Sequence, residues 1–272
     1  MAALAEQLGL NEGAARRYLR WIGDLLQGDM GISYAYSTPV TALIAERLMV
    51  TVPLALLAFA LSTVLALAAG IYAAARQGRA GDGVVMALSQ LGLAVPNFWF
   101  AIGLIWLFAV GLQWLPAGGF AGWQAGTLAA LRSLILPAVA LAVVQAAILA
   151  RVVRAAVLEQ LGEDFVRTAR AKGLSRGQVL RRHVLPNAAV PLLTVMGLQF
   201  ANLLAGTVVI ENVFTLPGLG RLMFQAIANR DLVVVRNGVL LLAALVVVVN
   251  FVVDLLAAAA DPRVQLNDDA AA

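Results

Sequence analysis

The stretch "LMVTVPLALLAFALSTVLALAAGIYAAA" (residues 48–75) carries no charged side chain between Arg47 and Arg76. A helix of about 20 apolar residues is long enough to cross the hydrocarbon core of a bilayer. A charged residue at the centre of such a helix costs roughly 2.5–3.5 kcal/mol on insertion scales, so uncharged runs mark the membrane crossings. This stretch therefore predicts a transmembrane helix over about 51–75.

The composition of the whole chain indicates a membrane protein. Hydrophobic residues make up 62% of the chain and charged residues 12%, about half the share of charge found in soluble domains. A soluble fold could not cover its surface with so few polar groups, whereas a lipid-facing fold need not. The net charge of +4 does not point to nucleic acid, because the basic residues cluster between apolar runs. The chain has no cysteine, which excludes disulfides and thiolate metal sites.

Four further uncharged runs predict four more transmembrane helices. None of these runs shows the apolar–polar alternation of a half-buried strand. The predicted fold is an all-α, polytopic transmembrane domain over 48–260 with about five spans. After the first span, we expect the others at about 84–112, 134–156, 189–210 and 239–257.

The charges in the loops predict how the chain is oriented. Segments 76–82 and 151–183 carry ten Lys and Arg, against four in 113–132 and 211–236. The positive-inside rule places the first two segments in the cytoplasm. The C-terminal tail 261–272 is then cytoplasmic and the N-terminal segment 1–47 extracytoplasmic. Because no helix precedes segment 1–47 to carry it across, we expect a first transmembrane helix to be missing from this chain.

The segment "TARAKGLSRGQVLRRHVLP" (168–186) is too basic to lie in the membrane. A first helix is predicted through "EQLGEDFVRTARAK" (159–172). Gly173 follows it, and a glycine directly after a helix can adopt the left-handed conformation without a Cβ clash. The segment therefore predicts a sharp break between two helices.

The second helix of this segment is predicted at about 176–184. Ser175 as N-cap and Gln178 three residues later form a capping box, and Leu174 can meet Val179 as a hydrophobic staple. Pro186 is expected to stop the helix. Helices shorter than ~12 residues are marginal in water unless something packs on them. We therefore expect a docking element, the alternative being a solvated loop whose arginines only enforce topology.

This segment resembles the cytoplasmic "EAA" loop of binding-protein-dependent ABC transporter permeases. That pattern reads E-A-A, three residues, Gly, nine residues, I-x-L-P. Gly173, Leu185 and Pro186 stand at the required spacing, whereas His183 replaces the Ile and the E-A-A positions hold Arg167, Thr168 and Ala169.

The form "DFVRTARAKGLS" (164–175) is similar to the dipeptide/oligopeptide/nickel branch of that family. Segments that agree with this branch cover nearly the whole chain in the right order. They are "YLRWIGDLLQGDMGISY" (18–34), "PVTALIAERL" (39–48), "VPNFWFAIGLIWLFAV" (95–110), "LPAGG" (115–119), "ENVFTLPGLGRL" (211–222) and "DLLAAAADPRV" (254–264).

The resemblance implies a type I ABC importer permease of the cell inner membrane, surrounded by lipid. Its expected partners are separate ABC ATPase subunits, a second permease subunit forming a heterodimer, and an extracytoplasmic substrate-binding protein. Peptides are the substrate class implied by the branch, with nickel chelates, glutathione-like compounds and sugars as alternatives. The loop 160–186 would couple the permease to the ATPase, with Leu174, Val179 and Leu185 packed on it. The coupling positions are Arg167, Thr168, Ala169, Gly173, Leu174, Ser175, Val179, Leu185 and Pro186.

No catalytic residue, metal site or cofactor is expected in this chain. The sequence lacks G-x-x-x-x-G-K-[ST], so ATP hydrolysis is expected in another chain. It also lacks H-E-x-x-H and G-x-S-x-G, which argues against an intramembrane enzyme. The alternative is an ion-coupled secondary carrier, which usually needs paired carboxylates or broken helices at mid-membrane. Only Asp254 comes near that requirement.

Two groups of residues inside the spans have two interpretations each. Ala66, Gly70 and Ala74 share a helix face and favour close helix packing, although any Ala-rich span shows such spacings. Four polar residues could line a hydrophilic path or form hydrogen bonds between helices. These are Asn97, Gln145, Gln199 and Asn202.

Overall fold

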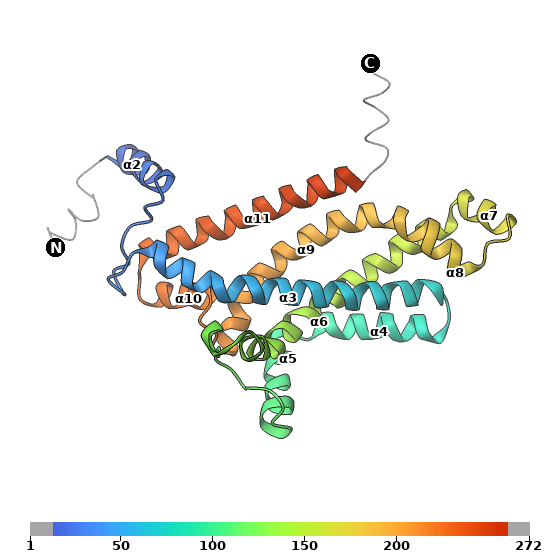
Figure 1. Cartoon of the computed structure of the whole chain (residues 1–272), viewed down its shortest axis with the longest axis horizontal. Helices are drawn as coiled ribbons and strands as arrows, with labels where there is room; N and C mark the ends of the chain where they lie inside the picture. Colours follow the sequence, from blue (N-terminus) through green and yellow to red (C-terminus); the bar gives the residue numbers. More distant parts are fainter. Residues whose placement is uncertain (1–12, 261–272) are drawn as a thin grey trace, which may run out of the picture.

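The computed structural model describes residues 13–260, and over that range the chain is helical apart from turns and one isolated bridge between Ile32 and Pro39. The long helices run roughly along one axis of the molecule (Figure 1). They are α3 (Val40–Ala75), α6 (Thr127–Gly162), α9 (Leu185–Val213) and α11 (Leu232–Ala260).

Each long helix contains a segment apolar and long enough to cross a membrane. Helix α6 is the central one, because 72% of its most apolar window is buried, against 33% or less in the other three. It packs on α3, α4 (Ala80–Ala94) and α9. The core of the protein therefore forms around α6, while the outer faces of α3, α9 and α11 remain apolar and exposed.

The span expected at 84–112 is not one straight helix. Helix α4 ends at Ala94, and α5 (Asn97–Leu104) with the π-helical segment Ile105–Gly111 follows after a bend of 100°. Pro96 explains the break, because proline pushes the preceding residue out of the helical region, and Val95 is indeed extended. With the bent pair counted as one span there are up to five, the number expected.

Gly70 marks the closest approach of α3 to α6. A Cβ built on Gly70 would lie 2.6 Å from both the Ala150 carbonyl oxygen and the Val153 Cβ. Ala66 and Ala74, on the same face of α3, are also buried. The packing interpretation of these small residues is therefore confirmed.

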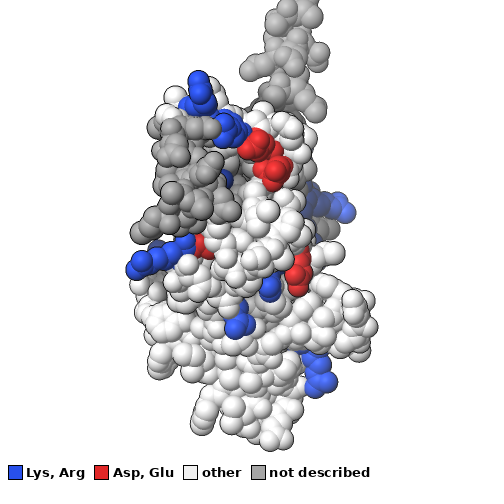
Figure 2. Space-filling model, turned by 90° about the vertical axis from the view of Figure 1, so that its left-hand side faces the viewer, with Lys and Arg blue, Asp and Glu red and all other residues white. Residues whose placement is uncertain are grey.

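The two ends of the molecule differ. The turn between α3 and α4 lies at one end together with α7 (Asp164–Ala171) and α8 (Arg176–Val179), and α2 (Ala14–Leu26) and α10 (Leu219–Ala228) lie toward the other (Figure 1). Seen from the α2 and α10 end, charged side chains gather in the upper half (Figure 2). The lower part, formed by α5 and the π-helical segment, is almost free of charge.

Candidate functional site

The segment 160–186 is built as two short helices around a left-handed glycine. Helix α7 ends at Ala171, and Gly173 has φ +86°. The amide of Gly173 donates to the Arg170 carbonyl at 2.9 Å, and the amide of Leu174 donates to the Ala169 carbonyl at 3.3 Å. These two bonds form a Schellman motif, which requires a left-handed residue at this point. The conformation expected for Gly173 is confirmed.

The capping box at the start of α8 is also confirmed. The Gln178 amide donates to the Ser175 hydroxyl at 3.4 Å, and the Ser175 amide donates to the Gln178 side-chain oxygen at 2.9 Å. Because these bonds satisfy two amides that would otherwise lack partners, the chain is held at a fixed angle as it enters α8.

Pro186 does not stop the second helix. Helix α8 continues through the π-helical segment Leu180–Val184 directly into α9, which begins at Leu185. The prediction was wrong because Pro186 directly follows a π-helical stretch, where the regular i→i−4 hydrogen bonding is already interrupted, so the helix can continue past the missing amide. As a result, α8 is joined to the long helix α9 without an intervening loop.

Apolar side chains pack segment 160–186 against helix α6 of the same chain. Val166, Val179 and Val184 are almost fully buried, and they share one hydrophobic cluster with Val153 and Val157 of α6. We expected Val179 to pack on a partner, but its side chain is fully covered here. Sequence alone could not tell whether this apolar face would meet α6 or another protein. Val179 is thus an anchor of α8 rather than a contact residue.

The remaining expected coupling residues divide by exposure. Arg167 forms an exposed ion pair with Asp164 at 3.1 Å. Ala169 is buried, and Leu174 and Leu185 are half-buried. The other expected positions are exposed and can be reached from outside the chain, namely Arg167, Thr168, Gly173, Ser175 and Pro186.

The exposed surface of the segment is strongly basic. Five cationic side chains besides Arg167 are exposed from α7 to the start of α9, against the exposed carboxylates of Glu159, Glu163 and Asp164 nearby in the sequence. The segment therefore presents a basic surface at the end of the bundle. The five are Arg170, Lys172, Arg176, Arg181 and Arg182.

Two of the four polar residues expected along a path are hydrogen-bonded to each other's backbone. Gln145 of α6 and Gln199 of α9 bind each other's backbone carbonyls at 3.5 and 3.4 Å. This reciprocal pair favours the interhelical interpretation, although Oε1 of Gln199 is buried without a partner. Asn202 is exposed on α9, and Asn97 is half-buried at the start of α5. The side chain of Asp254 lies outside the described residues.

A buried carboxylate that the sequence analysis did not single out stabilises the end opposite to segment 160–186. Glu211 is fully buried and accepts hydrogen bonds from the Thr51 hydroxyl at 2.6 Å and the Arg221 amide at 3.0 Å. A Cβ on Gly218 would lie 2.3 Å from the Glu211 carboxyl carbon. Glu followed by the glycines of "PGLG" was the signal that could have revealed this contact.

The fold is that of an ABC importer permease. The chain superposes on a chain of the inward-facing MetNI methionine ABC transporter with a TM-score of 0.65. The sequences are 21% identical, and the match covers 80% of this chain and 96% of the other. An amino acid ABC transporter gives a TM-score of 0.59 at 17% identity, covering 80% of this chain and 94% of the other.

The chain belongs to the family of binding-protein-dependent transport system inner membrane components, whose profile matches residues 66–266. A Brucella abortus protein named as a peptide transport system permease is 46% identical over 261 residues, which is 96% of this chain and 83% of that protein. The dipeptide transport system permease protein DppB of Escherichia coli K12 is 35% identical, over 97% of this chain and 85% of its own. The chain is thus a multi-pass membrane protein of a transport permease family, as predicted.

Proposed function

We propose that this chain is the permease subunit of an ATP-driven peptide importer and that segment 160–186 couples it to a separate ATPase. The observation that carries the proposal is the rigid unit formed by α7, Gly173 and α8. It stands at one end of the bundle, is anchored by Val166 and Val179, and exposes a basic surface.

The continuity of α8 with α9 supports a mechanical role for this unit. A displacement of α8 is transmitted to α9 because helical backbone joins them through Leu180–Val184. The shared cluster around Val153 transmits it to α6. Closure of an ATPase pair against α8 would therefore rock the rigid spans between inward- and outward-open states.

The basic surface is complementary in charge to an acidic partner. Arg176 and Arg181 are exposed at the two ends of the short helical stretch, and Leu174 and Leu185 remain half-buried beside them. An ATPase groove with apolar walls and an acidic rim would match this surface. The end that carries segment 160–186 would face the cytoplasm of the cell inner membrane, in keeping with the positive-inside rule.

The substrate class and the other partners come from the relatives. The Brucella abortus and Escherichia coli proteins are named as peptide and dipeptide permeases. We assign peptides to this chain on that basis. A second permease subunit would complete the pathway, and an extracytoplasmic binding protein would deliver the peptide at the end that carries α10.

Site-directed photocrosslinking tests the proposed docking. Because the chain has no cysteine, Arg176→Cys and Arg181→Cys each create a single site for a benzophenone maleimide. Leu128→Cys, 82% exposed at the start of α6, is the matched control away from segment 160–186. In membranes that hold the whole transport system, the first two variants should crosslink to a chain with a G-x-x-x-x-G-K-[ST] motif. An equal yield of that product from Leu128→Cys would refute the proposal.

A further inference from the structure

An apolar groove of about 300 Å³ opens between α3, α4 and α6. Small side chains make it concave: a Cβ on Gly92 of α4 would lie 3.0 Å from the Ala147 Cβ of α6, so these two helices approach closely at its floor. Its walls are apolar except for Ser89. The lining residues are Leu65, Ala69, Val85, Leu88, Ser89, Gly92, Val143, Ala146, Ala147 and Ala150.

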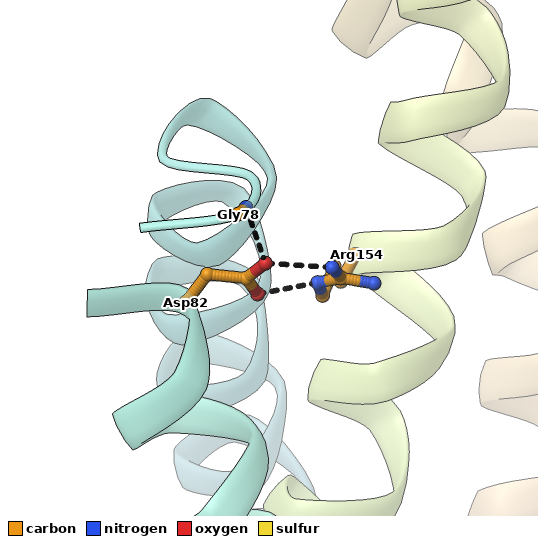
Figure 3. A network of polar contacts seen from close by, with 3 residues as sticks. All are labelled: Gly78, Asp82 and Arg154. Atoms are coloured by element: carbon orange, nitrogen blue, oxygen red, sulfur yellow. Dashed lines mark hydrogen bonds and ion pairs between the residues drawn. The ribbon is translucent and has the colours of Figure 1, made fainter. Parts of the chain in front are cut away.

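An ion pair closes one end of this groove. Helical periodicity places Arg154 one turn beyond Ala150 on α6, and Asp82 one turn before Val85 on α4. The two side chains face each other across the gap (Figure 3), with Arg154 Nε 2.6 Å and Nη2 2.7 Å from the two Asp82 oxygens. Arg154 on the neighbouring helix α6 thereby neutralises the charge of Asp82.

Three exposed arginines surround the same end of the groove. Arg151 follows Ala147 by one turn, Arg76 follows Ala69 by two turns, and Arg79 stands at the start of α4. Among the residues that the structure describes, none of the three forms an ion pair. Arg76 donates to the Tyr72 hydroxyl at 3.0 Å and lies 4.7 Å above the ring. The groove therefore ends in uncompensated positive charge.

We propose that this groove holds an acyl chain of an anionic phospholipid whose phosphate is bound by Arg76, Arg79 and Arg151. Apolar walls suit hydrocarbon, and basic pockets between transmembrane helices on the cytoplasmic side suit anionic head groups. Tyr72, 43% exposed beside Arg76, lies where the aromatic belt of a membrane protein meets the head groups. The proposed lipid site rests on the proposal that this end of the bundle faces the cytoplasm. It does not require the ATPase.

The alternative occupant is an apolar helix of the second permease. Such a helix would cover the walls of the groove but would leave the three guanidinium groups without counter-charge. The charge at its end therefore favours the lipid.

Quenching by brominated lipids distinguishes the occupants. Leu88, 62% exposed on the groove wall, is replaced by cysteine and labelled with bimane in the assembled transporter. The transporter is reconstituted with brominated phosphatidylglycerol or brominated phosphatidylcholine. We expect half-maximal quenching at a roughly fivefold lower mole fraction of phosphatidylglycerol, the preference that about one basic contact supplies.

Two double variants complete the test. Arg76→Gln with Arg151→Gln should abolish the preference, and Arg181→Gln with Arg182→Gln should keep it, because those arginines lie in segment 160–186 away from the groove. Equal quenching by both lipids in the unaltered protein would show that the groove meets only bulk bilayer. Absence of quenching by either lipid would show that protein covers it. Either result overturns the proposal.

Discussion

Arg154 of α6 binds both carboxylate oxygens of Asp82 of α4, and the Gly78 amide adds a third bond to that carboxylate at 3.0 Å. The residues lie far apart in the sequence, so their pairing ties the start of α4 and the preceding turn to the central helix (Figure 3). The planar guanidinium matches a carboxylate through two parallel bonds, which a lysine cannot do.

Substitutions at Arg154 should separate the effect of its positive charge from the effect of its two parallel hydrogen bonds. Arg154→Lys keeps the charge but loses the paired bonds, so its melting temperature in detergent should fall below that of the unaltered protein. Arg154→Gln should fall further. The effect of combining Arg154→Gln with Asp82→Asn should be smaller than the sum of the single effects, because both remove the same contact. Additive effects would show that the pair contributes nothing jointly.

Gly70 should not tolerate a methyl group. Gly70→Ala places a Cβ 2.6 Å from the Ala150 carbonyl oxygen, so α3 and α6 must separate. Such overpacking costs about 1–3 kcal/mol of the free energy of unfolding. Gly83→Ala is the matched control, because nothing lies within 4 Å of its Cβ, and it should raise helix stability by roughly 0.5–1 kcal/mol. Thermal unfolding of the two variants in the same detergent compares them, and equal stability would contradict the packing described.

The buried Glu211 should tolerate replacement by an amide better than loss of both oxygens. Glu211→Gln keeps one acceptor oxygen for the Thr51 hydroxyl but turns its NH2 donor toward the Arg221 amide, whereas Glu211→Ala leaves both that hydroxyl and that amide unpaired. Each buried group without a partner costs about 1–3 kcal/mol. Denaturant unfolding should place Glu211→Gln between the unaltered protein and Glu211→Ala. If Glu211→Gln were as damaging as Glu211→Ala, the bond to the Thr51 hydroxyl would contribute nothing to stability.

The contact between residues 33–35 and Asp231, in the turn before α11, should weaken in acid. Burial raises the pKa of Asp231, but hydrogen bonds from the Ser33 hydroxyl at 2.5 Å and from the amides of Ala35 and Val234 outweigh it, so the pKa lies below its ordinary value. A lowered folded-state pKa contributes stability above the unfolded pKa, and that stability is lost as pH falls from about 5 toward 2.

Hydrogen exchange measures this loss. The protection factor of the Ala35 amide, corrected for intrinsic exchange, should fall across that pH range. In Asp231→Ala it should be low at every pH. Protection that is independent of pH in the unaltered protein would show that the ionised carboxylate does not hold this segment.

Local signals in the sequence were sufficient for the backbone around Gly173. The Schellman glycine and the capping box depend on neighbours within a few residues, so the sequence predicts them directly. The direction in which Val179 points was not predictable, because an apolar helix face looks the same whether α6 or a partner covers it. The continuation of the helix past Pro186 was not predictable either, because it depends on the π-helical stretch Leu180–Val184, which no local sequence signal marks.

Long-range polar contacts left little trace in the sequence. Asp82 pairs with Arg154 only because α4 folds back along α6, and no periodicity encodes that pairing. The bend at Pro96 was hidden inside an uncharged run whose length fits a single span. The number and apolar character of the helices were predictable because the membrane imposes them, whereas their kinks and cross-links depend on tertiary packing.

We propose that the angle fixed by Gly173 couples ATP hydrolysis to peptide uptake, and a comparison of two valine variants measures that coupling. Gly173→Val forces a β-branched residue to φ +86°, whereas Gly177→Val makes the same change at a helical position with nothing within 4 Å of the Cβ. Both variants are reconstituted with the complete transporter, and peptide uptake is measured per ATP hydrolysed. We expect a ratio close to that of the unaltered protein for Gly177→Val and a loss of most uptake per ATP for Gly173→Val. An unchanged ratio for Gly173→Val would show that the angle at this glycine has no part in coupling.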